Sequence, residues 1–126
     1  MTEDGARLNN LLVSFPRLFS KPLPWGLEIG GGWIELIELL CARIDTILNE
    51  APAATFEVTQ VKEKFGRLRF YYRLEKADDA IRDAIQQAIQ TAEAASAHCC
   101  ERCGARGQLV NKGGWLSTRC PNCDDH

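Results

Sequence analysis

Six cysteines carry the clearest chemical signal in this chain, and four of them form two Cys-x-x-Cys pairs. Cys100 and Cys103 make the first pair, Cys120 and Cys123 make the second, and sixteen residues separate the two. Two thiolates in one tight turn can bind the same metal ion, and paired cysteines about fifteen to twenty residues apart are typical of structural zinc sites. The spacing therefore predicts one Zn²⁺ ion held by four thiolates.

The residues beside these pairs leave the choice of ligands open. Cys99 precedes Cys100, so a first pair formed by Cys99 and Cys103 is sterically feasible, and His98 and His126 offer imidazole nitrogens as substitutes. Four unrelated reduced cysteines, a redox dithiol and an iron site are the alternatives to zinc. A closed set of four thiolates favours zinc over iron, and neither pair has a thioredoxin-like strand and helix around it. A site closed in this way is structural, because a catalytic zinc keeps one position open for water.

The segment around the cysteines, residues 98–126, is predicted to be a small zinc-ribbon or treble-clef-like module. Residues 108–110 and 115–118 flank a glycine-containing turn at 111–114, which predicts a hairpin joining the two cysteine pairs. So short a segment cannot bury enough apolar surface to fold alone, so the metal must supply the missing free energy. We therefore predict two units, a body over 1–97 and the zinc-binding module over 98–126.

Helical periodicity predicts three helices in the body. Apolar residues recur at i, i+3, i+4 and i+7 over about 4–15 and 33–48. Asp78 or Asp79 can cap a third helix, which is rich in alanine and leads directly into the cysteine segment. Cys41 lies near the margin of the apolar stripe of the second helix, where a buried, inert thiol is expected.

A β-hairpin is predicted between the second and third helices. Residues 56–62 and 67–74 have strand-like alternation, and Gly66 provides the turn between them. The apolar face of the second strand comprises Leu68, Phe70, Tyr72 and Leu74. Its opposite face comprises Arg67, Arg69, Tyr71 and Arg73. The predicted fold class is α+β, with helices packed on an antiparallel hairpin and the zinc module at the C-terminal end.

The overall composition is that of a water-soluble globular protein, with 45% hydrophobic and 25% charged residues. Charged residues interrupt every long apolar stretch, so we expect no transmembrane helix and no membrane partner. The first residues have neither the basic region nor the apolar core of a signal peptide, which predicts a cytoplasmic protein with reduced cysteines. The net charge of −2 argues against a surface that binds nucleic acid all round.

The run Val61-Lys62-Glu63-Lys64-Phe65-Gly66-Arg67-Leu68-Arg69-Phe70-Tyr71 resembles a motif of small uncharacterised proteins from bacteria and their phages. In these proteins, as here, a Gly-Trp-x-x-Leu-Ile helix (32–37) precedes the motif, and a helix and a cysteine-bearing tail with a Gly-Trp pair (114–115) follow it. The resemblance extends over about 32–123. It implies an accessory product of a mobile element: an inhibitor of host defence, a toxin-immunity partner or a nucleic-acid-handling factor.

The sequence has few of the residues that catalysis requires. Its two histidines, His98 and His126, both flank the predicted metal site, and no phosphate-binding or dinucleotide-binding glycine motif is present. We therefore predict a protein that is not an enzyme and that acts by binding.

The predicted binding surface is the cationic strand face formed by Arg67, Arg69, Tyr71 and Arg73, together with Trp115 as an aromatic anchor. Guanidinium groups pair well with carboxylates, so the expected partner is a protein with an acidic surface, bound stoichiometrically by an inhibitor or immunity-type protein. The alternative is a nucleic-acid-binding zinc-ribbon protein in which the same arginines contact phosphates. In that version the tail contributes further cations, namely Arg102, Arg106, Lys112 and Arg119.

Overall fold

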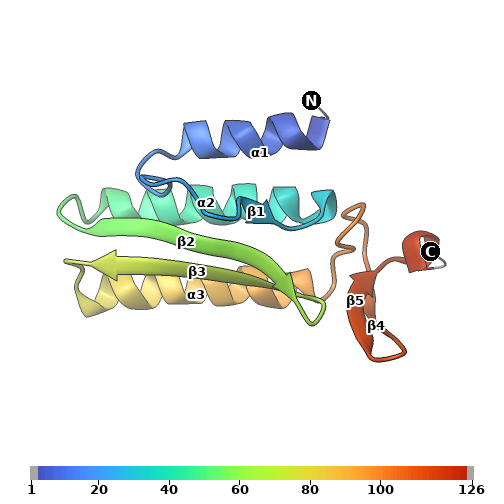
Figure 1. Cartoon of the computed structure of the whole chain (residues 1–126). Coiled ribbons are helices and arrows are strands. Elements are labelled where there is room, and N and C mark those ends of the chain that lie inside the picture. Colours follow the sequence, from blue (N-terminus) through green and yellow to red (C-terminus); the bar gives the residue numbers. More distant parts are fainter. Residues whose placement is uncertain (1–2, 125–126) are drawn as a thin grey trace.

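The computed structural model describes residues 3–124 (Figure 1). The body contains α1 (Glu3–Ser14), β1 (Leu27–Glu28), a 3₁₀ turn η1 (Gly31–Trp33), α2 (Ile34–Asn49), β2 (Thr55–Lys64), β3 (Arg67–Glu75) and α3 (Asp79–Ser96). The tail contains β4 (Gln108–Lys112), β5 (Trp115–Arg119) and α4 (Pro121–Asp124). The chain is thus mixed α+β, as the sequence predicted. Within the described residues, no helix combines the length and apolar character that a membrane span needs.

The body sheet has the strand order β1-β2-β3, with β2 and β3 antiparallel and the very short β1 parallel to β2. A shift of register between Val58 and Gln60 marks a β-bulge in β2. The bulge resets the alternation, so Val61 is buried on the same side of the strand as Val58. In β3, Leu68 and Phe70 are buried, which confirms the predicted apolar face.

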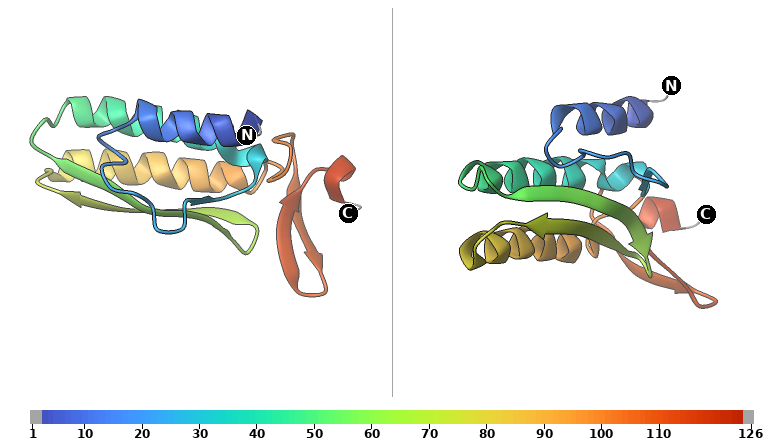
Figure 2. Two further views of the ribbon diagram at one scale, coloured as in Figure 1. Left: turned by 45° about the horizontal axis from the view of Figure 1, so that its top comes forward. Right: turned by 60° about the vertical axis from the view of Figure 1, so that its left-hand side comes forward.

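Helices α2 and α3 lie side by side over one face of the sheet, and α1 lies beyond α2 (Figures 1 and 2). Asp78, one of the two predicted candidates, caps α3 by accepting a hydrogen bond from the Ile81 N–H at 2.9 Å. Cys41 is fully buried, and its burial, with the nearby Asp45 charge, raises its pKa to about 12. The thiol is therefore protonated and shielded, as an inert core residue should be.

Within residues 3–124, no helix covers the opposite face of the sheet, and α3 protects the outer edge of β3. The Leu68 N–H donates to Ser96 Oγ at 2.9 Å, and the Phe70 N–H donates to a Glu93 carboxylate oxygen at 3.0 Å. Side chains of α3 thus satisfy donors that an edge strand would otherwise expose. The consequence is that the helices cover the apolar face and leave the cationic face of the hairpin exposed.

Candidate metal centre

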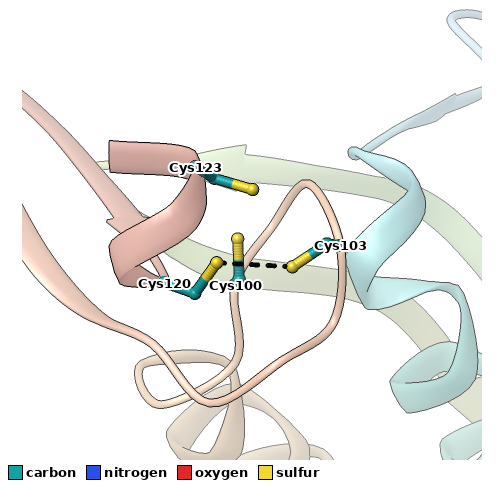
Figure 3. Close-up of side chains that lie close together, drawn as sticks. All are labelled: Cys100, Cys103, Cys120 and Cys123. Atoms are coloured by element: carbon teal, nitrogen blue, oxygen red, sulfur yellow. Dashed lines mark hydrogen bonds between the residues drawn. The ribbon is translucent and has the colours of Figure 1, made fainter. Parts of the chain in front are cut away.

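The side chains of Cys100, Cys103, Cys120 and Cys123 converge on one point (Figure 3), and their sulfur atoms all lie within 4.8 Å of one another. The Cys103 and Cys120 sulfurs are 3.5 Å apart, and all six cysteines are free of disulfides. A zinc ion with four sulfurs at about 2.3 Å in tetrahedral geometry requires sulfur–sulfur distances of about 3.8 Å. The four predicted ligands are therefore arranged as a metal ion would need them.

Each cysteine pair is presented by one tight turn. After α3 the chain turns back on itself, with the Gly104 N–H donating to the Cys100 carbonyl at 2.9 Å. The second pair begins where β5 ends, and the Cys123 N–H donates to the Cys120 carbonyl at 3.1 Å at the start of α4. The antiparallel β4–β5 hairpin joins the two turns, as the glycine-containing segment between them predicted.

The electrostatics of the cluster favour a cation. Burial raises the pKa of Cys100, but hydrogen bonds from the backbone of Cys120, Cys103 and Arg102 outweigh this effect and lower the pKa to about 6. The thiol of Cys123, which shares a hydrogen bond with Cys120 and lies near the other sulfurs, has its pKa raised to about 12. Four thiols this close cannot all ionise by themselves, and a bound cation is what allows them to do so.

The alternative ligands are not in the cluster. Cys99 points away from it, with its sulfur 3.5 Å from the Gly32 carbonyl and 3.6 Å from the Gly104 carbonyl. His98 is exposed, and among the described residues the metal-ligating group contains only the four paired cysteines. His126, the third substitute, lies outside the described residues.

Hydrogen bonds connect the first cysteine turn to the start of α2. The indole N–H of Trp33 donates to the Cys99 carbonyl at 2.8 Å, and the Gly32 N–H donates to the Glu101 carbonyl at 3.0 Å. A side chain at position 32 would place its Cβ only 2.0 Å from the Cys100 carbonyl oxygen, so glycine is required there by close backbone approach. Sequence periodicity assigned Trp33 to the apolar stripe of α2 and gave no sign of these contacts.

The second half of the tail contacts the turn between β2 and β3. Thr118 is fully buried, and its hydroxyl donates to the Gly66 carbonyl at 2.5 Å. The Thr118 N–H in turn donates to the Glu101 carboxylate at 3.1 Å, and that carboxylate lies 3.5 Å from the Arg119 guanidinium. The cysteine cluster is thus tied both to α2 and to the tip of the cationic hairpin.

The residues predicted to bind a partner lie on the helix-free side of the hairpin and on the tail. Arg67, Tyr71 and Arg73 are exposed, and Arg69 is half-buried. The Arg73 guanidinium lies 3.5 Å from the Glu57 carboxylate, so its charge is partly compensated. Trp115 is 72% exposed at the start of β5.

Two cations on β2 were not among the predicted binding residues. Lys62 is directly opposite Arg69, and Lys64 is directly opposite Arg67. In the sequence, Lys62 and Lys64 are two residues apart, as side chains on one face of a strand are. The β-bulge interrupts the alternation of residues 56–64, so this pattern alone did not show which face they share. We call Lys62, Lys64, Arg67 and Arg69 the cationic block.

Comparison of the chain with protein-family models, curated proteins and solved structures gives no match.

Proposed function

We propose that this chain is a non-enzymatic, zinc-stabilised binding protein that contacts an acidic protein partner through its cationic block. The zinc assignment is supported by the donor set, since four thiolates in a closed arrangement are the usual ligands of structural zinc. The order of the elements, a cysteine turn, a hairpin and a second cysteine pair at the start of α4, supports the treble-clef version of the module. Reduced cysteines fit a cytoplasmic location.

The observation that carries the binding proposal is the pairing of like charges across the hairpin. Lys64 faces Arg67 and Lys62 faces Arg69, and like charges directly opposite each other destabilise a sheet. Among the side chains of residues 5–124, no carboxylate lies within salt-bridge distance of any member of the block. Carboxylates of a partner would relieve the repulsion, and the two arginines can each bind one in a bidentate manner.

The dimensions of the block favour a protein over nucleic acid. Its four residues span one two-residue repeat, about 7 Å along the strands, and one strand spacing, about 5 Å across them. The opposite end of the same two strands carries the carboxylate of Glu57 beside Arg73. In the tail, Arg119 is paired with Glu101 and Lys112 with Asp124, so two of the four tail cations are already neutralised. A short acidic segment matches this bounded patch better than a long phosphate backbone does.

The biological class that we propose is an inhibitor or immunity-type accessory protein of a phage or mobile element. Its support is the resemblance of the 61–71 run to such proteins and the position of that run, which forms the hairpin with the cationic block. The same resemblance includes nucleic-acid-handling factors, and Tyr71, exposed on the strand that carries Arg67 and Arg69, can stack on a base. Nucleic-acid binding is therefore the second candidate and is one outcome of the test.

The test measures the binding of a fluorescent polyglutamate peptide and of oligo(dT) across a series of salt concentrations, using protein that elemental analysis shows to contain one zinc per chain. We expect the peptide to bind and the Arg67→Glu/Arg69→Glu variant to lose this binding with little change in melting temperature. Arg43→Glu, an exposed charge reversal on α2, is the control and should bind as the wild type does.

Three results would contradict the proposal in different ways. Protein purified without zinc would exclude the metal assignment. Tighter binding of oligo(dT) than of the peptide, with a steep loss of affinity as salt rises, would identify the partner as nucleic acid. Equal peptide binding by the double variant and the wild type would show that the cationic block is not the contact surface.

A further inference from the structure

Phe65 is an unusual residue for the turn in which it lies. Phe65 and Gly66 form the two-residue turn of the β2–β3 hairpin, with φ angles of +54° and +79°. Positive φ at both positions is typical of a type I′ turn, where Asn-Gly or Gly-Gly is strongly favoured and a bulky side chain is rare at the first position. The ring does not compensate by packing into the core, since Phe65 remains 63% exposed.

The β4–β5 hairpin in the tail has the same kind of turn, but both of its positive-φ positions are glycines, which adopt this conformation without strain. Gly113 and Gly114 have φ angles of +62° and +91° and join β4 to β5. The exposed aromatic residue follows immediately as Trp115, the first residue of β5. Each of the two hairpins therefore carries an exposed aromatic side chain at its tip, and in the first hairpin that placement goes against the preference of the turn.

The two aromatic residues line one pocket of about 200 Å³, together with Glu63, Gly114 and Leu116. The pocket is held in place by the contact between the hairpins. A Cβ on Gly66 would come within 2.6 Å of the Leu109 side chain, and the Thr118 hydroxyl binds the Gly66 carbonyl. The backbone that carries the two aromatic residues is thus held in place before any ligand arrives, which lowers the entropic cost of binding.

We propose that this pocket binds an apolar side chain of the same acidic partner, with Phe65 and Trp115 as the anchoring residues. The inference rests on the proposed function and adds a specificity pocket to the charged contact. The two sites are continuous along the chain, because Lys64 belongs to the cationic block and its ammonium lies 5.6 Å from the centre of the Phe65 ring. A partner segment that pairs its carboxylates with Lys64 and Arg67 can therefore place a neighbouring residue at the pocket.

The chemistry of the pocket favours an apolar side chain over a nucleobase. Its charged wall residue is Glu63, whose carboxylate already accepts a hydrogen bond from the Gly66 N–H at 2.7 Å. The other side chains that line the pocket, those of Phe65, Trp115 and Leu116, are apolar and suit an aliphatic or aromatic side chain. Exposed aromatic residues beside arginines are also the usual composition of binding hot spots.

The experiment compares two glutamate-rich peptides that are identical except for one central residue, leucine in one and serine in the other. We expect the wild-type protein to bind the leucine peptide about tenfold more tightly, as for one buried aliphatic side chain. Phe65→Asn and Trp115→Ala should each remove most of this preference and weaken binding of the serine peptide much less. Trp25→Ala is the matched control, because Trp25 is equally exposed, at 68%, in the connector before β1.

A second readout separates a binding role from a structural one. Asparagine suits the first position of a type I′ turn, so Phe65→Asn should raise the melting temperature by a few degrees while the peptide preference falls. A lower melting temperature would show that Phe65 stabilises the fold. If the wild type binds both peptides equally, or both variants keep the preference, the pocket proposal is wrong and the charged contact stands. If neither peptide binds, the proposed function itself fails.

Discussion

Replacing Gly32 by alanine tests how firmly the cysteine tail is attached to the body. The new Cβ would lie 2.0 Å from the Cys100 carbonyl oxygen, 2.6 Å from the Gly104 nitrogen and 2.8 Å from the Glu101 carbonyl carbon. All three are backbone atoms, so no side-chain rotation can relieve the overlap. The backbone that carries the first cysteine pair must move away from η1 by about 1 Å to restore ordinary contact distances.

The cost follows from the interactions that this movement disrupts. The hydrogen bonds from Gly32 to Glu101 and from the Trp33 indole to Cys99 contribute about 1 kcal/mol each, and the overpacking costs about 1–3 kcal/mol. Alanine also lowers the conformational entropy of the unfolded chain relative to glycine, and this offsets up to about 1 kcal/mol of the loss in stability. The net loss is about 3 kcal/mol. With an unfolding entropy of about 2.1 cal/mol/K per residue, this lowers the melting temperature of a 126-residue chain by about 10 °C.

The assay is calorimetric or circular-dichroism melting of the zinc-loaded protein. Gly113→Ala is the matched control: its φ of +62° makes alanine unfavourable, but no atom lies within 4 Å of the added Cβ. Backbone strain alone should cost about 1–2 kcal/mol there, so the control should melt well above Gly32→Ala. If Gly32→Ala melts at or above the temperature of Gly113→Ala, the contact between η1 and the cysteine turn does not stabilise the fold as we argue.

Two further predictions concern the core. Phe70→Ala should lower the free energy of unfolding by about 3–5 kcal/mol, measured by denaturant titration, because Phe70 is buried between the hairpin and the helices; a loss below about 1 kcal/mol would contradict the register of β3. Cys41 should resist alkylation in the native protein and react only after unfolding. Since its pKa is raised from 9.0 to about 12, folding favours the protonated thiol, so its contribution to stability declines as pH rises from about 9 towards 12.

Local periodicity predicted the body well where one pattern holds over the whole element. The leucine and isoleucine repeat of α2, the alternation of β3 and the cap at Asp78 each depend on residues close together in the sequence. In β2 the alternation predicts correctly which residues are buried only up to the bulge. A strict alternation from Phe56 would turn Val61 towards solvent, whereas the extra residue between Val58 and Gln60 returns it to the core.

Long-range contacts made by polar groups were not predictable from the sequence. The Arg17 guanidinium donates to the carbonyls of Leu48, Ala51 and Ala54 at 2.7–2.8 Å and so satisfies the C-terminal end of α2 and the loop after it. The Trp33 indole reaches a carbonyl 66 residues away. No spacing rule connects such pairs, because their separation is set by the packing of the complete fold.

The clustering of the paired cysteines was predictable because each pair lies within one turn, whereas the sequence left open whether Cys99 or Cys100 joins the cluster. Neighbouring residues in an extended segment point in opposite directions, so only one of them can face the other cysteine pair. The contact with Gly32 determines which cysteine joins the cluster. Cys99 points towards the Gly32 carbonyl, and Cys100 therefore faces Cys120 and Cys123. The ambiguity in the tail is thus resolved by a glycine in the body.

The cysteine cluster lies where a bound metal ion would stiffen the proposed binding surface. The apolar core lies between the sheet and the helices, whereas Phe65 and Trp115 lie beyond it and remain exposed. The buried hydrogen bond from Thr118 to Gly66 anchors the β2–β3 turn to the tail, and Thr118 is two residues from Cys120. A metal ion at the four cysteines would hold β5 in place and, through Thr118, the turn that carries Phe65. A metal ion bound there would order the backbone that carries Phe65 and Trp115 and the adjoining cationic block, without itself contacting the proposed partner.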